Sequence, residues 1–174
     1  LVNAWGFGPE RSQPDPARIS QLHSQPRQLA ADVLQLDTAN SQVLKLAPVS
    51  LDLCGIAKGY GVDQLARCLD DWGIADYLVG IDGEMRAQGC KPDGQPWVVA
   101  LEKPVRGVRE VMDVMEISNA AIATSGDYRH WVELDGKTFS HTMQPGQQAP
   151  VSGSLTAVSV IESSCMLADA WATA

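Results

Sequence analysis

The sequence is short of positive charge. Thirteen Lys and Arg residues stand against twenty-one Asp and Glu residues, and the net charge is −8. Because nucleic-acid binding relies on a surplus of basic side chains, we expect no nucleic-acid partner. The sequence also lacks the uncharged apolar run of roughly 20 residues that a transmembrane helix needs, and it has no basic signal-peptide region at its start. What is present, 45% hydrophobic and 20% charged residues over 174 positions, predicts one globular domain.

Several catalytic and metal-binding patterns are absent as well. The four cysteines include no C-x-x-C pair, so they match neither a zinc spacing nor a thioredoxin-like spacing. We expect ordinary thiols, mostly packed in the interior. The patterns G-x-S-x-G and H-E-x-x-H do not occur, which leaves serine hydrolase and zinc protease functions without support. The cysteines are Cys54, Cys68, Cys90 and Cys165.

Apolar periodicity and turn residues predict a mixture of hairpins and helices. A helix is expected from Pro16, with Asp15 as its N-cap. The strongest hairpin signal is Asp135-Gly136, because this pair tolerates the positive φ angles of a type I′ turn. Because hairpins and helices mix without strict alternation, we predict a single α+β domain. Strands are expected at 33–36, 43–46, 51–53, 77–81, 85–87, 97–101, 131–134, 137–140 and 155–161, and helices at 60–73 and from 165 onward.

A glycine loop lies between the expected strand 51–53 and the helix after it. It runs from Gly55 to Gly59 and contains Lys58, with Asp52 just upstream. It is not a P-loop, because Lys58 follows Gly55 by only three positions and precedes glycine instead of Ser or Thr. Exposed backbone, one cation and one acceptor suit a bound ligand. Alternatively, the glycines only let the helix fit tightly against the sheet, and Lys58 is a solvated surface residue.

The last expected helix carries Asp169 and Thr173 four residues apart, hence on one face. Two hard oxygen ligands among small and apolar neighbours suit Mg²⁺. The alternative is structural, because an aspartate can bond a neighbouring strand and a helical threonine commonly bonds its own backbone.

Three further clusters carry polar groups. Residues 82–84, Asp-Gly-Glu, indicate an ordinary tight turn, and 124–128 form either an anion-binding loop or a plain turn. His141 follows the Asp135-Gly136 hairpin. It could act as a general base, although a lone histidine is more often structural.

Taken in order, these clusters resemble the FAD:protein FMN transferase (ApbE) family. Residues 52–63 (DLCGIAKGYGVD) resemble its first motif, 123–129 (ATSGDYR) its second, 140–142 (SHT) the start of its third, and 168–173 its fourth. Residues 1–8 also resemble a family segment. The match covers nearly the whole chain, so we expect residues 1–174 to be the core of such a transferase domain, truncated at both ends.

The resemblance implies a set of ligands. A divalent cation, usually Mg²⁺, would be held by the backbone carbonyl of Gly55 and by Asp169 and Thr173. FAD would be contacted at Asp52, Lys58 and Met143. The expected acceptor is a Ser or Thr hydroxyl in flavoprotein subunits of membrane redox complexes. The expected location is the periplasmic face of the inner membrane, through an N-terminal lipid anchor that this chain does not contain.

The implied reaction is phosphoryl-type transfer. The acceptor hydroxyl attacks the FMN-side phosphorus of FAD, AMP leaves, and the metal and Lys58 offset the phosphate charge. His141 is the candidate base. The family continues its third motif as H-x-x-D-P-x-T-G-x-P, whereas residues 141–150 read HTMQPGQQAP. The alternatives are a Mg²⁺-dependent FAD pyrophosphatase, with water as acceptor, and a non-catalytic flavin-binding domain.

Overall fold

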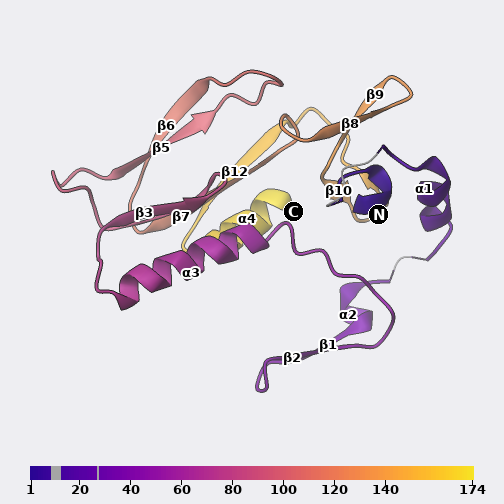
Figure 1. The fold of residues 1–174 in the computed structure, drawn as a ribbon, viewed down its shortest axis with the longest axis horizontal. Coiled ribbons are helices and arrows are strands. Elements are labelled where there is room, and N and C mark those ends of the chain that lie inside the picture. The colour runs from indigo at the N-terminus through magenta and orange to yellow at the C-terminus, as the bar shows by residue number, and fades with distance from the viewer. Residues whose placement is uncertain (9–12, 27) are drawn as a thin grey trace. The chain divides into compact units, whose positions relative to one another are not determined.

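The computed structural model describes residues 1–8, 13–26 and 28–174 (Figure 1). They form two compact units, Leu1–Asp52 and Leu53–Ala174, which we call the N-terminal and C-terminal units. Within these ranges no helix is long and apolar enough to cross a membrane. The prediction that residues 1–174 are the core of one transferase domain stays a prediction.

The N-terminal unit consists of short elements. As predicted, Asp15 caps the first α-helix, because its carboxylate accepts the Arg18 N–H at 3.0 Å. The Asp15 N–H donates to the Ala4 carbonyl at 2.8 Å, which ties this helix to the preceding turn. The predicted hairpin at 33–46 is confirmed. The elements are the 3₁₀ helix η1 (Val2–Trp5), helices α1 (Pro16–His23) and α2 (Ala30–Val33), and strands β1 (Leu34–Asp37) and β2 (Gln42–Lys45).

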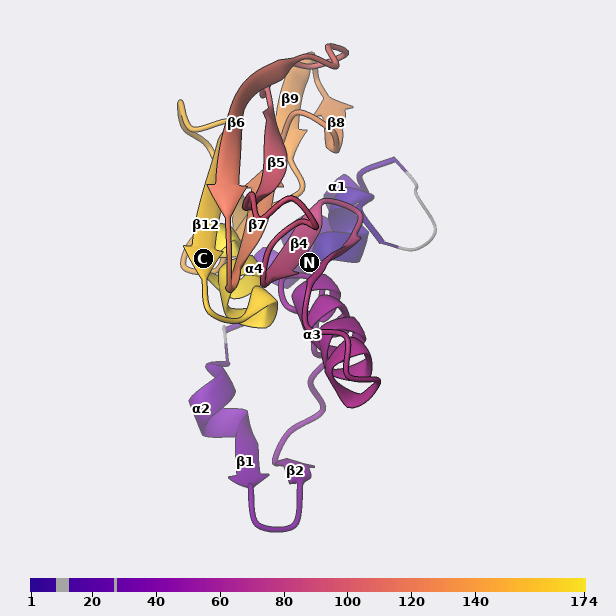
Figure 2. The same ribbon diagram turned by 90° about the vertical axis from the view of Figure 1, so that its left-hand side faces the viewer.

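An antiparallel sheet organises the C-terminal unit, with strand order β12-β7-β4-β3. Helices α3 and α4 lie side by side on one face of this sheet, and the β5–β6 hairpin covers the other face (Figures 1 and 2). The fold is therefore α+β, as predicted. The bounds are α3 (Ala57–Asp71), β3 (Tyr77–Ile81), β4 (Glu84–Gln88), β5 (Trp97–Glu102), β6 (Val111–Ile117), β7 (Ala120–Gly126), β12 (Ala157–Glu162) and α4 (Cys165–Thr173).

Alternation along the central strands divides the core into two layers. Ile122 of β7 packs toward the hairpin, in a cluster with Val99 and Ile117. Its neighbour Ala121 faces the helices and packs with Val62 of α3. Successive strand residues point to opposite faces. The central strands β4 and β7 are therefore covered on both faces, and the polar residues that they turn toward the helices lie in a packed layer.

The remaining strands form two small hairpins. In the first, Asp135 and Gly136 both have positive φ, 51° and 70°, which confirms the predicted type I′ turn between β8 (Trp131–Leu134) and β9 (Lys137–Ser140). The second pairs β10 (Met143–Gln144) with β11 (Ala149–Pro150).

The expected strand at 51–53 is wrong. These residues form no strand, because the Leu53 carbonyl instead accepts the N–H groups of Ile56 and Ala57 in the turn that leads into α3. Helix α3 accordingly begins three residues before the predicted start at Tyr60. Trp72, which falls within the helix expected at 60–73, lies beyond the observed helix end and is 86% exposed.

Candidate active site

Helices α3 and α4 meet at a buried hydrogen bond. The Gly59 N–H in the first turn of α3 donates to Oδ2 of Asp169 in α4 at 3.0 Å. A Cβ atom at Gly59 would lie 2.3 Å from the Cys165 carbonyl oxygen, so only glycine allows this approach. Tight packing is therefore one role of the loop, but it is packing of helix against helix and not of helix against sheet.

A second contact joins the end of α4 to the loop and to β7. The Thr173 Oγ1 and the Ser125 Oγ lie 2.9 Å apart. A Cβ atom at Gly55 would lie 3.3 Å from the same Thr173 oxygen, which places this glycine directly against the threonine. Asp169 lies one turn earlier on α4. The structure thus gathers the three residues that the resemblance implied as metal ligands, Gly55, Asp169 and Thr173, where α3 begins and α4 ends.

Lys58 pairs with a buried carboxylate. Its Nζ lies 2.7 Å from Oε1 of Glu84; the Lys58 side chain is 41% exposed and that of Glu84 only 3%. Glu84 is the first residue of β4 and follows a turn in which Asp82 and Gly83 have φ of 48° and 104°. The tight turn at 82–84 is confirmed, and it places the buried Glu84 carboxylate beside Lys58 of the glycine loop. Lys58 is therefore not the purely solvated residue of the alternative interpretation.

Glu84 is held in an unfavourable electrostatic environment. Burial raises the pKa of its carboxyl group, and the nearby negative charge of Asp169 adds to this effect. Lys58 opposes the rise, but the net pKa remains above its ordinary value. The second oxygen, Oε2, is buried without a hydrogen-bond partner among the described residues. A buried acceptor of this kind is costly, which is typical of a functional carboxylate.

Asp63 anchors the two helices to the sheet. It accepts hydrogen bonds from Arg86 of β4 at 2.6 Å, from the Ser164 hydroxyl at 2.8 Å, and from the N–H groups of Cys165 and Met166 at 3.0 Å each. Burial alone would raise the pKa of Asp63, but these donors outweigh it and lower the pKa. A carboxylate at a helix N-terminus also interacts favourably with the helix dipole. Asp63 thereby positions α4, and with it Asp169.

His141 lies in the segment between β9 and β10. It is half-buried, and its ring contacts His130 edge-on with centroids 5.8 Å apart. Burial lowers the pKa of His141, and the positive charges of His130 and Lys58 lower it further. A lowered pKa keeps the imidazole neutral near pH 7, the form that can accept a proton. His141 belongs to the C-terminal unit, as do Lys58 and Asp169.

The altered third motif still forms a hairpin. Met143 is half-buried in β10 and pairs with Pro150, and the Val151 N–H donates to the Thr142 carbonyl at 2.8 Å. Met143 lies two residues after His141 and is carried by this hairpin. Asp52 is the last residue of the N-terminal unit, so its expected contact with FAD stays a prediction.

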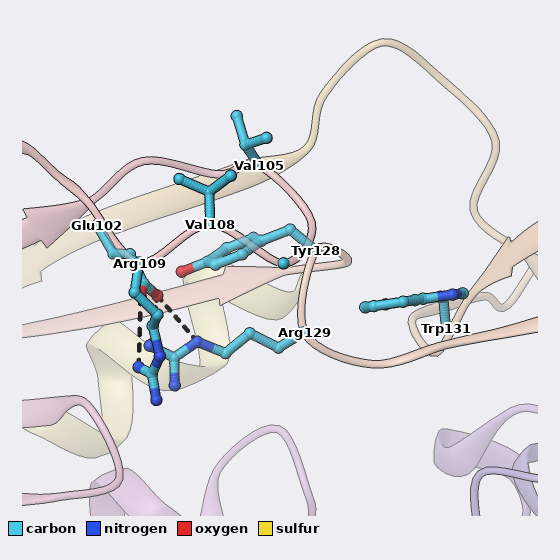
Figure 3. Close-up of a pocket in the computed structure, with 8 residues that line it drawn as sticks. Glu102, Val105, Val108, Arg109, Tyr128, Arg129 and Trp131 are labelled. Carbon is cyan, nitrogen blue, oxygen red and sulfur yellow. Dashed lines mark hydrogen bonds and ion pairs between the residues drawn. The ribbon is translucent and has the colours of Figure 1, made fainter.

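A separate cavity of about 330 Å³ opens beside the β5–β6 hairpin (Figure 3). Glu102 holds two guanidinium groups there, with Arg109 Nη1 at 3.3 Å from Oε1 and Arg129 Nε at 3.0 Å from Oε2. Arg106 stacks over Trp131 at 5.0 Å. Arg129, which belongs to the second family motif, therefore bonds within the protein.

The hydroxyls of the second motif are also engaged. Thr124 Oγ1 lies 2.7 Å from Ser159 Oγ across β7 and β12, and Ser125 bonds Thr173. Residues 124–126 lie within strand β7, so only 127–128 remain in the loop or turn that was predicted for 124–128.

The expectation of mostly packed thiols is wrong. Only Cys165 is buried; Cys54 and Cys68 are exposed, and Cys90 is partly exposed. Cys54 lies at an exposed position of the turn 54–56, and Cys68 lies at an exposed position of α3, so neither side chain is covered by the sheet.

The donor set at this site fits a hard cation. Asp169 is 2% exposed, and the Thr173 hydroxyl and the Gly55 backbone lie together. Over the ranges the structure describes, no group of three or more His, Cys, Asp or Glu side chains is placed to hold a metal. A cation here would depend on one carboxylate together with hydroxyl, carbonyl and water oxygens, as Mg²⁺ sites commonly do.

Comparison with known proteins gives the family. The model of the ApbE family matches residues 1–174. The chain belongs to the ApbE family. It is 41% identical over 173 residues to an FAD:protein FMN transferase of Vibrio cholerae and 38% identical over 178 residues to one of Salmonella typhimurium, with 99% of this chain covered in both. The resemblance predicted from the motifs is confirmed.

Solved ApbE structures share the fold. The chain superposes on the flavin transferase ApbE from Vibrio cholerae with a TM-score of 0.79 at 38% identity, covering 99% of this chain and 54% of that one. For the ApbE protein of Thermotoga maritima the TM-score is 0.81 at 28% identity, covering 99% and 55%. The chain spans about half the length of the curated relatives it matches, 52% and 50% for the two named above.

Sequence reasoning missed the charged residues that surround the candidate site. Glu84 was interpreted as part of a turn, and neither Asp63 nor Arg86 was assigned a role. A signal was available for the latter two: Asp63 follows the apolar Val62 in the predicted helix, and Arg86 lies between Met85 and Ala87 in the expected strand 85–87. A buried charge is costly unless it is paired, so two opposite charges at buried positions are expected to form an ion pair.

Proposed function

We propose that the protein containing this chain is an FAD:protein FMN transferase. The observation that carries the proposal is the cluster at the α3–α4 junction, where Gly55, Asp169 and Thr173 meet and Lys58 lies in the adjoining turn. The names of the similar proteins support it, because those proteins are FAD:protein FMN transferases. FAD is accordingly the substrate.

We propose Mg²⁺ as the cofactor, held by the Gly55 carbonyl, the Asp169 carboxylate and the Thr173 hydroxyl. Without a cation, the charged side chains Lys58, Glu84 and Asp169 carry one positive and two negative charges, which would repel a pyrophosphate. A bound Mg²⁺ would supply positive charge that stabilises negative charge on the phosphate oxygens. The buried carboxylates are therefore consistent with a site built for cation and substrate together.

The side chains of this chain then have distinct roles. The Lys58 ammonium binds phosphate oxygens, and Met143 and Asp52 contact the flavin nucleotide. The His141 imidazole accepts the proton of a Ser or Thr hydroxyl on the acceptor protein as that oxygen bonds to the FMN-side phosphorus. The bond from this phosphorus to the bridging oxygen breaks, and AMP leaves with that oxygen. The lowered pKa of His141 suits this role.

The proposed acceptors are flavoprotein subunits of membrane redox complexes, and the proposed location is the periplasmic face of the inner membrane. These follow from the family resemblance alone. A mature N-terminus that carries a lipid would support the location.

The metal assignment is tested by Asp169→Asn in the full-length protein. Asparagine keeps an oxygen for the Gly59 N–H but removes the charge, so Mg²⁺-dependent release of AMP from FAD should fall by about 100-fold or more. Asp71→Asn, at an exposed position, is the matched control. Equal AMP release from wild type and Asp169→Asn, or release that persists in EDTA, would overturn the assignment.

A further inference from the structure

We propose that Glu84 is a positioning residue that fixes the Lys58 ammonium for phosphate binding. The inference rests on the proposed function, since it assigns a role within that same site. Glu84 lies outside the motif that contains Lys58: it is the first residue of strand β4, whereas Lys58 lies in the first turn of α3.

The first argument is that no structural need explains this buried carboxylate. Asp63, by contrast, is a buried acid that receives four hydrogen bonds from a helix end and two side chains. Glu84 pairs through one oxygen with Lys58, and Oε2 has no hydrogen-bond partner in the described part of the chain. An isoleucine or glutamine would fill the position at lower electrostatic cost.

The second argument is geometric. A lysine side chain has a flexible four-carbon stem, so an exposed ammonium samples many positions. Glu84 is held by pairing with Ile81 across the turn at 82–83, and its side chain is 97% buried, which leaves it little freedom. The 2.7 Å contact therefore restricts Lys58 to one location beside the α3–α4 junction. An ammonium has three N–H donors, so pairing with Glu84 leaves donors for a phosphate.

The third argument concerns Oε2. A buried carboxylate oxygen that lacks a donor in the protein can accept one from a bound ligand or from a water molecule ordered by it. Glu84 pairs with Lys58, and the next residue, Gly59, donates its N–H to Asp169 at 3.0 Å, so the pair lies beside one of the proposed cation ligands. Glu84 would thus act through Lys58, without contacting the phosphate itself.

The pairing can be tested without any activity measurement. Glu84→Gln in the full-length protein should increase the rate at which Lys58 reacts with an amine-acylating reagent by several-fold, as followed by mass spectrometry of peptides. The ion pair holds the amine against the strand, and the variant releases it. Lys103 is the internal reference, because its ion pair with Glu110 is long and open to solvent: the Nζ–Oε2 distance is 3.4 Å and the Glu110 side chain is 62% exposed. Glu110→Gln is the matched control. An unchanged Lys58 rate in Glu84→Gln would overturn the pairing.

The functional role is tested by kinetics on folded variants. Glu84→Gln should lower kcat/KM for FAD by about tenfold, the usual effect of losing one charge-assisted contact. In a Lys58→Met background the same change should have no further effect, because Glu84 acts through Lys58. Additive losses in the double variant, or a Glu84→Gln protein with wild-type kcat/KM, would overturn the inference. If the wild type consumes no FAD, the proposed function fails, and the labelling experiment still decides whether Glu84 holds Lys58.

Discussion

The Gly59 amide and the Asp169 carboxylate are 110 positions apart in sequence and 3.0 Å apart in space. This hydrogen bond orients a buried carboxylate at the junction of α3 and α4, with its oxygen Oδ2 engaged by the amide. It also couples the packing of the two helices to the geometry of the site, because the same glycine permits their close approach. A change in either residue should therefore alter stability and function together.

Gly59→Ala should destabilise the protein by about 2 kcal/mol or more, because overpacking against backbone cannot be relieved by a side-chain rotation. The new methyl group would meet the Cys165 carbonyl oxygen at 2.3 Å and the Met166 Cα at 2.7 Å. Gly146→Ala is the control, since nothing lies within 4 Å of a Cβ atom there. The midpoint of urea unfolding is measured for each variant. Equal midpoints for the two variants would contradict the close helix contact.

Asp63→Ala should cost about 3 kcal/mol of unfolding free energy, because it leaves Arg86 and the start of α4 without their acceptor. Asp71→Ala, at an exposed position at the end of α3, should change little.

The contribution of Asp63 should also depend on pH. Its folded-state pKa is lowered, so its stabilisation is present above the ordinary value of 3.8 and is lost as the pH falls through the folded-state pKa. Unfolding of wild type and Asp63→Asn should therefore converge in acid. A difference that does not change between pH 7 and acid would contradict this account.

Cys165 should resist thiol reagents until the protein unfolds. Burial raises the pKa of its thiol to about 12, with the charge of Asp63 as a further cause, and the side chain is inaccessible. Cys68 is exposed on α3 and should react much faster than Cys165. Peptide mapping after a short exposure to iodoacetamide distinguishes them. Labelling of Cys165 as fast as Cys68 in folded protein would show that α4 does not cover the sheet as described.

The stability effect of Glu84→Gln should change with pH in the opposite sense to that of Asp63→Asn. The pKa of Glu84 is raised, so its favourable contribution is present below the ordinary value of 4.5 and is lost as the pH rises through the folded-state pKa. The melting temperature of Glu84→Gln relative to wild type should therefore increase from pH 4 to pH 8, measured in EDTA to keep cations out. If the melting temperature of Glu84→Gln relative to wild type falls over this range, the effect of Lys58 on the pKa of Glu84 outweighs the effect of burial.

Local signals predicted much of the fold. The Asp135-Gly136 turn and the Asp15 cap were recognisable because their chemistry acts within a few residues. The strand at 51–53 was mispredicted, since a short apolar run says nothing about whether a neighbouring strand is available to pair with it. Strand β6, in which Val111 and Val114 are exposed, was not predicted because both faces carry apolar residues and no alternation marks it.

The site was predicted only as far as its motifs reached. Asp169 and Thr173 share a helix face, which spacing shows directly, and the family resemblance supplied Gly55 and Lys58. The pairing of Lys58 with Glu84 could not be derived, because Lys58 lies on a helix and Glu84 on a strand whose position follows from the sheet register. Long-range pairs of this kind require the tertiary fold.

The central claim, transfer of FMN to a protein, is tested most directly by weighing the acceptor. The full-length protein is incubated with FAD, Mg²⁺ and a purified flavoprotein subunit produced in cells without a flavin transferase, and AMP is assayed in parallel. The proposed function predicts an acceptor heavier by one FMN and an equal amount of AMP, both lost in Asp169→Asn. AMP release with an unmodified acceptor would contradict transfer in favour of hydrolysis, and the absence of both products would contradict an enzymatic role.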